Sequence, residues 1–90
     1  MVHHETIVVS GKVQGVFFRA SAKERAEQLG INGIVRNLPD GRVHIEAEGS
    51  AENLDHFRSW CATGPPRAVV EKVESHTGEL SNYDSFKVVR

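Results

Sequence analysis

The pattern of apolar and polar positions divides the chain into short strands and two helices. Alternating side chains or β-branched runs predict strands over 5–10, 33–38, 42–48, 67–75 and 85–89. In 42–48 the odd-numbered residues are apolar and the even-numbered ones polar, as in a sheet with one covered face. The Pro39-Asp40-Gly41 turn before this segment predicts a hairpin. The register around Val69-Val70 stays open between a regular ladder and one with a bulge.

In the first half of the chain, apolar residues between the predicted strands recur at helical spacing. One face of about 19–29 collects Phe18, Ala22, Ala26 and Leu29. This spacing starts the helix near Arg19, whereas a capping box of Ser21 and Glu24 would start it at Ala22. Both starts place Arg19 at the junction between loop and helix. Gly30 is predicted to end the helix.

A second helix is predicted after Ser50, which is a typical N-cap residue, and it ends before Gly64-Pro65-Pro66. Its inward residues are Leu54, Phe57 and Cys61. The order β-α-β-β-α-β predicts an α+β fold, a ferredoxin-like sandwich with two helices on one face of an antiparallel sheet. Enzymes, regulatory modules and RNA-binding domains share this fold, so the fold alone does not assign a function.

Composition limits the number of domains and the kinds of partner and cofactor to expect. Ninety residues predict one domain, 1–90, with residues 1–4 frayed. Eleven basic against twelve acidic residues give a net charge of −1, which argues against nucleic-acid or membrane partners. The single Cys61 excludes an internal disulfide, and the neighbouring His3 and His4 lack a third metal ligand. With no signal peptide or spanning segment recognised, a cytoplasmic protein without metal or cofactor is expected.

The segment 11–19 carries the chemistry that is easiest to interpret. It lies between a predicted strand and a predicted helix, begins with glycine and ends with Arg19. Gly11 and Gly15 allow the main chain to approach a ligand closely. Free N–H groups at a helix start favour anions, and a guanidinium matches phosphate or carboxylate geometry. This segment therefore predicts an anion site.

Two motifs together resemble a known family. The segment Gly11-Lys-Val-Gln-Gly-Val-Phe-Phe-Arg19 is similar to the Gly-x-Val-Gln-Gly-Val-x-Phe-Arg loop of acylphosphatases. The segment Gly33-Ile-Val-Arg-Asn-Leu-Pro-Asp-Gly-Arg-Val43 is similar to the hairpin of the same family. The resemblance extends from about residue 5 to residue 90. Ile34 departs from it, because that position is often aromatic in the family, which affects packing beside the sheet rather than chemistry.

The resemblance implies a monomeric acylphosphatase that hydrolyses a small carboxylic–phosphoric mixed anhydride to carboxylate and orthophosphate without a metal. It implies that Arg19 binds the phosphoryl group and that Asn37 holds the attacking water. The implied phosphate-binding loop consists of Gln14, Gly15, Val16, Phe17, Phe18 and Arg19. Inorganic phosphate or sulfate should then compete with substrate.

The chemistry of acyl phosphates agrees with these roles. Their leaving group is a carboxylate, which needs no protonation near neutral pH, so positioning and charge stabilisation suffice. Asn37 cannot act as a general base, but its amide can orient water. Taken alone, Asn37 would more often support the turn that follows. It shares the alternation face of Val35, however, and it matches the family position.

Other side chains of the motifs have plainer interpretations. Lys12 and Gln14 are expected to have solvated side chains, while Phe17 and Phe18 are expected in the core or against the loop. His44 is expected on an exposed face.

Two other functions stay open. An RNA-binding module would need aromatic residues on the third strand and a basic surface, which are absent. A non-catalytic accessory domain would use the loop for binding only; the short chain and the presence of both motif residues favour a free-standing enzyme.

Overall fold

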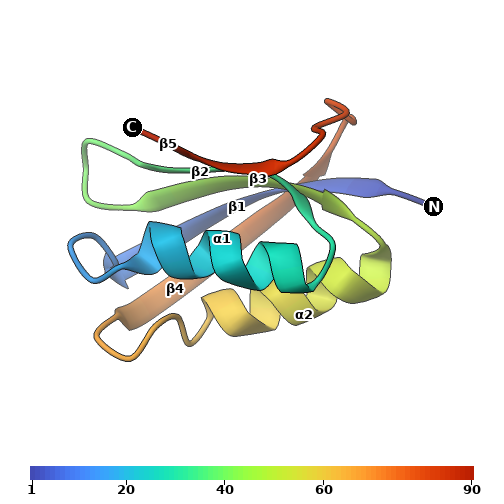
Figure 1. Ribbon diagram of the computed structural model, residues 1–90. Coiled ribbons are helices and arrows are strands. Elements are labelled where there is room, and N and C mark those ends of the chain that lie inside the picture. Colours follow the sequence, from blue (N-terminus) through green and yellow to red (C-terminus); the bar gives the residue numbers. More distant parts are fainter.

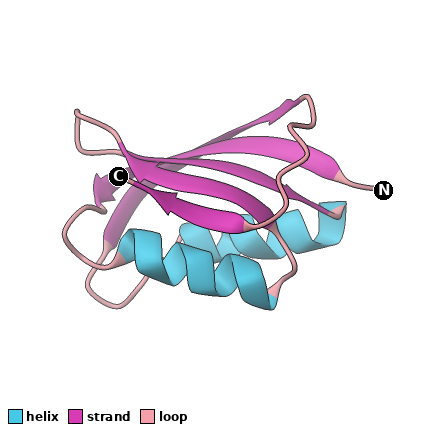
Figure 2. Cartoon of the chain, turned by 45° about the horizontal axis from the view of Figure 1, so that its top comes forward, coloured by secondary structure: helices cyan, strands magenta, loops and turns pink.

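The computed structural model describes residues 1–90 as two layers, a sheet and a pair of helices (Figures 1 and 2). The elements in chain order are β1 (His3–Lys12), α1 (Phe18–Gln28), β2 (Asn32–Asn37), β3 (Val43–Gly49), α2 (Ala51–Cys61), β4 (Val69–Gly78) and β5 (Phe86–Val89). Both helices cover the same face of the sheet (Figure 1). The predicted ferredoxin-like α+β sandwich is confirmed. Neither helix is long and apolar enough to cross a membrane.

The sheet has five strands in the order β4-β1-β3-β2-β5. Its β1–β3, β1–β4 and β2–β3 pairs are antiparallel, as predicted. The segments 67–75 and 85–89, which the β-α-β-β-α-β order combines into one last strand, form two separate strands, β4 and β5. After β4, a loop crosses the end of the sheet, and β5 runs parallel to β2, with Gly33 opposite Phe86. The prediction of a purely antiparallel sheet is therefore corrected at this edge, where β5 brings its end beside the end of β2.

The core lies between the helices and the inner face of the sheet. The fully buried side chains come from both layers: Ile7, Val9, Val35, Val43, Ile45, Ala47, Phe18, Ala22, Ala26, Leu54, Phe57 and Cys61. Trp60 packs over one edge of this core, with ring centroids 5.3 Å from Phe18 and 6.1 Å from Phe57. Burial of apolar surface between the two layers stabilises the fold by about 25 cal/mol for each Å² removed from water. The inward faces predicted for both helices are confirmed.

The two helices begin in different ways. Ser50 caps α2 as predicted, because its hydroxyl accepts a hydrogen bond from the Asn53 N–H at 3.1 Å. α1 has no side-chain cap, and it starts where Phe17 takes a left-handed conformation with φ 66° and ψ 23°. The Ser21 N–H donates to the Phe17 carbonyl at 3.0 Å. The capping-box start at Ala22 is therefore wrong, because Ser21 already lies inside the first turn.

A β-bulge resolves the open register near Val70. Ser10 pairs with Lys72 while Gly11 pairs with Val70, so Glu71 is the extra residue. Gly11 has φ 125°, and a Cβ atom added there would lie 2.2 Å from the Val69 carbonyl oxygen. Only glycine fits this backbone, because a side chain would collide with the neighbouring strand. The bulge thus sets the direction in which β1 leaves the sheet toward the loop before α1.

The outer face of the sheet carries a hydrogen-bonded cluster around His4. The expectation that residues 1–4 are frayed is wrong for His3 and His4, because both pair with β3. The side chain of His4 is only 6% exposed, and it lies between two carboxylates. Its Nδ1 lies 2.8 Å from Glu48 Oε2, and its Nε2 lies 2.5 Å from Glu46 Oε1. Carboxylates only accept hydrogen bonds, so this arrangement suits the protonated imidazole, in which both ring nitrogens donate.

The same cluster includes a second histidine and a loop. His44 was expected on an exposed face, but it is half-buried, with Nε2 2.5 Å from Glu46 Oε2 and Nδ1 accepting from Arg36 at 2.9 Å. Glu48 accepts hydrogen bonds from the Ser81 and Tyr83 N–H groups, at 2.5 and 3.0 Å. These bonds fasten the loop between β4 and β5 to the sheet.

The cluster predicts a pH-dependent stability. Burial disfavours the charged form of each group, but the hydrogen bonds within the cluster favour it more strongly. The pKa of His4 is therefore raised from 6.5, and the pKa values of Glu46 and Glu48 are lowered from 4.5. The contribution of His4 is fully present below its ordinary pKa and is lost as pH rises through the raised one. The contribution of the carboxylates is present above 4.5 and is lost as pH falls through their lowered pKa values.

We therefore expect the free energy of unfolding, measured by urea titration, to fall as pH rises above 6.5. The His4→Gln variant should lose this decline, since it has no proton to release. His56→Gln is the matched control, because the side chain of His56 on α2 is 63% exposed. An equal decline in wild type and His4→Gln would contradict the assigned role of His4.

Candidate functional site

The predicted loop and hairpin meet at one end of the sheet. The β1–α1 loop, the β2–β3 turn and the C-terminal end of β5 lie together there, far from the N-terminus (Figure 1). Between them is a cavity of about 350 Å³. Its lining consists of Val13, Gln14, Gly15, Phe17, Phe18, Arg19, Ala20, Asn37, Val88 and Arg90. Of the predicted site residues, only Val16 is absent from this lining, because its side chain is buried beneath the loop.

The backbone of the loop is shaped to present N–H groups. Gly15 has φ 73° and Phe17 has φ 66°, with Val16 between them at negative φ. This alternation of left-handed and ordinary conformations is the backbone pattern of anion-binding nests, in which successive N–H groups turn toward one point. The first N–H groups of α1 extend this nest, since they have no partner within the helix. The loop thus joins a nest to the positive end of a helix dipole.

Arg19 adds a cation where the protein supplies no counter-charge. It is the second residue of α1, and its guanidinium makes no ion pair or hydrogen bond with the protein. The first turn of α1 contains no acidic residue. A cation near a helix N-terminus is unfavourable for the helix alone, because both carry positive charge. Arg19 and the N-terminus of α1 therefore both place positive charge beside the cavity.

Asn37 supplies the one buried polar atom without a partner. It is the last residue of β2, where it pairs with Val43, and it lies on the inner face with Val35. Its Oδ1 is buried and accepts no hydrogen bond from the protein. A buried acceptor of this kind destabilises a fold by about 1–3 kcal/mol. Unpartnered polar atoms in a cavity point to a bound group that completes them.

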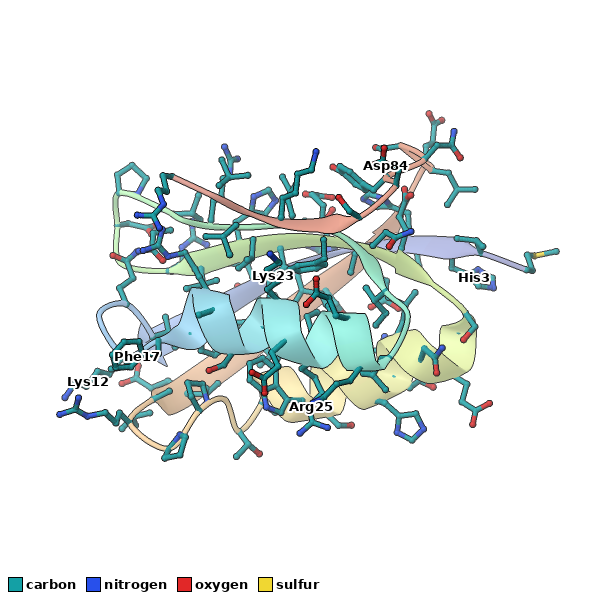
Figure 3. The ribbon with its side chains drawn as sticks, in the orientation of Figure 1. His3, Lys12, Phe17, Lys23, Arg25 and Asp84 are labelled. Carbon is teal, nitrogen blue, oxygen red and sulfur yellow. The ribbon has the colours of Figure 1, made fainter.

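Two side chains of the loop, Gln14 and Phe17, differ from the sequence-based expectation. Gln14 is not solvated: its Nε2 donates to the carbonyl oxygens of Leu38 and Arg42, at 2.8 and 2.9 Å. Phe18 is buried as predicted, but Phe17 is 69% exposed and points outward beside the cavity (Figure 3). The left-handed backbone at Phe17 causes this difference, because it rotates one of the two neighbouring rings away from the core.

Sequence reasoning missed the two lining residues at the C-terminal end of the chain, Val88 and Arg90. They reach the cavity only because β5 pairs in parallel with β2, placing Val88 opposite Val35. No local pattern in 85–90 indicates that pairing. The lining contains no carboxylate, imidazole or thiolate side chain, which are the side chains that metal ions prefer.

Comparisons with known proteins agree with the motifs. The sequence profile of the acylphosphatase family matches residues 5–88. A protein of Rubrobacter xylanophilus named acylphosphatase is 60% identical over 68 residues, which cover 76% of this chain and 62% of that relative, less than two thirds of its length. An acylphosphatase of Archaeoglobus fulgidus is 52% identical over 82 residues, covering 91% of this chain and 92% of the relative.

The fold gives the same result as the sequence. An acylphosphatase structure from Coxiella burnetii superposes with a TM-score of 0.95 at 38% identity, covering 98% of this chain and 93% of that one. The family profile spans both the loop and the hairpin that form the cavity. The chain therefore belongs to the acylphosphatase family.

Proposed function

We propose that this chain hydrolyses small acyl phosphates, with Arg19 and the loop N–H groups holding the phosphoryl group and Asn37 holding the attacking water. The observation that carries this proposal is Asn37, which lines the same cavity as Arg19 and whose buried Oδ1 has no protein partner. A water donating one hydrogen to Oδ1 would sit beside the anion site. That is where a nucleophile for a bound phosphoryl group is needed.

The reaction makes modest demands on the protein. Water attacks phosphorus, the P–O bond to the acyl group breaks, and the carboxylate leaves with the bonding electron pair. The proton of the water passes to a phosphoryl oxygen of the substrate, so no protein base is required. The site then contributes orientation and preorganised positive charge. The guanidinium fork and the converging N–H groups are suited to stabilise the equatorial oxygens as charge develops on them.

The proposal also covers competing anions, metal dependence, location and oligomeric state. Inorganic phosphate or sulfate should compete for the same N–H groups, because each presents the same tetrahedral oxygens. The reaction should need no metal, since the polar side chains that line the cavity are two amides and two guanidinium groups. We further propose a cytoplasmic monomer; its single cysteine, free and fully buried, fits the reducing conditions of that compartment.

Hydrolysis of benzoyl phosphate in the presence of EDTA tests the function directly. We expect turnover that EDTA does not change and that inorganic phosphate inhibits competitively. Absence of turnover, with phosphate still bound in calorimetry, would instead support an accessory domain that only binds anions. Turnover without competition by phosphate or sulfate would remove the loop as the anion site.

A further inference from the structure

We propose that Gln14 is a positioning residue that holds the phosphate-binding loop in register with the hairpin that carries Asn37. This inference rests on the proposed function, because it concerns the alignment of bound phosphate and water. Gln14 is part of the cavity lining, yet its amide is directed at the backbone of the hairpin.

The sheet pairs β1 with the hairpin only up to a point short of the loop. β1 follows β3 only as far as the pair Val9–Val43, after which β1 pairs with β4 alone. Beyond that point, the only hydrogen bonds between 13–17 and 38–42 are the two donated by Gln14 Nε2. The loop is therefore fastened to the hairpin by one side chain.

The bonds of Gln14 end on the residues that close the hairpin. Its Nε2 lies 2.8 Å from the Leu38 carbonyl oxygen and 2.9 Å from that of Arg42. The Leu38 N–H also donates to the Arg42 carbonyl at 2.8 Å, so this oxygen uses both lone pairs. Leu38 directly follows Asn37 in the chain. A shift of Gln14 would therefore move the residue next to the proposed water site.

The chemistry of the amide argues for positioning rather than substrate binding. A glutamine Nε2 carries two N–H donors, and both are used on carbonyl oxygens. The remaining Oε1 is only an acceptor, and it would repel a phosphate dianion. A carboxylate in its place would face two carbonyl oxygens with no hydrogen to donate. Gln14 thus fits the hairpin and contributes no donor to the substrate.

The expected consequence is a loss of rate without a loss of anion binding. A misplacement of about 1 Å between reacting groups lowers a rate by about 10²-fold. We expect Gln14→Met, which keeps side-chain length but has no donor, to lower kcat for benzoyl phosphate by about 10–100-fold. The inhibition constant of inorganic phosphate should stay within about threefold, because Arg19 and the loop N–H groups remain. Gln14→Glu should show the same loss of kcat. It takes the place of Gln14→Met if Gln14→Met does not fold.

A double-mutant cycle separates positioning from a general loosening of the structure. In an Asn37→Ala background, Gln14→Met should lower kcat by less than about threefold, because no water-holding group remains to be aligned. Lys12→Met is the control, since Lys12 is exposed, lies in the same segment and is not part of the cavity lining. It should leave kcat unchanged in both backgrounds.

Three results would overturn the proposal: an unchanged kcat in Gln14→Met, a phosphate inhibition constant weakened as much as kcat, or a full additive loss in the Asn37→Ala background. Failure of the proposed function has a different signature. It would show as no turnover by the wild type, or as an Asn37→Ala variant with wild-type kcat, which would also remove the alignment that Gln14 is proposed to serve.

Discussion

Replacing Arg19 by alanine is expected to lower kcat/KM for benzoyl phosphate by at least about 10²–10³-fold and to abolish competition by inorganic phosphate. The guanidinium is the only side-chain cation at the start of α1, and no protein carboxylate shares it. Its removal takes a two-pronged donor from the phosphoryl group in both ground state and transition state. Binding and rate should therefore fall together. Steady-state kinetics with phosphate as inhibitor measures both.

The stability of the same variant makes this result specific. A positive charge in the first turn opposes the helix dipole, so Arg19→Ala should unfold at equal or slightly higher urea concentration, with a gain of about 0.3–1 kcal/mol. Arg25→Ala is the matched control, because Arg25 lies farther along α1, away from the end that carries Phe17 (Figure 3). It should keep full activity. An Arg19→Ala variant with wild-type phosphate affinity would contradict the assigned anion site.

Replacing Asn37 by alanine is expected to lower kcat by about 10²–10³-fold while the inhibition constant of phosphate changes by less than about threefold. The buried Oδ1 makes no hydrogen bond within the protein, and in the proposed function this amide holds the attacking water. Without it, water loses its orientation, but the loop and Arg19 still hold phosphate. Comparing kcat with the phosphate inhibition constant therefore distinguishes this variant from Arg19→Ala.

Stability measurements add a second readout for Asn37. Removing a buried acceptor without a partner should not lower the free energy of unfolding, because no protein hydrogen bond is lost. The control is Asn32→Ala, at the other end of β2, where Nδ2 donates to the Tyr83 carbonyl at 3.2 Å. That variant should lose stability and keep kcat. Weakened phosphate binding in Asn37→Ala would show that the amide binds the anion rather than the water.

The sequence was sufficient for features that depend on local order along the chain. The helical spacing of Ala22 and Ala26 and the cap at Ser50 are set by neighbours within a few residues, and both predictions are confirmed. The loop and hairpin motifs also placed Arg19 and Asn37 in one cavity. Their chemical roles stay predictions, because they concern what the cavity binds.

Features that depend on pairing between distant segments could not be predicted from the sequence. Gln14 is 24 and 28 residues from its two carbonyl partners, and nothing near it indicates a bond across the site. His4 is buried only because β1 pairs with β3 and places it against Glu48. Periodicity also could not decide which of Phe17 and Phe18 enters the core. That choice follows from one backbone conformation at the helix start.

Aggregation through sheet edges requires a flat strand with open N–H and C=O groups. β4 offers ten residues of edge, but the extra residue Glu71 bends it, and Lys72 and Glu74 add charge. At the opposite edge, β5 has only four residues and includes Lys87. Neither edge is a good template for a strand of a second copy. The bulge that aims β1 toward the loop therefore also interrupts the regular edge of the sheet at β4.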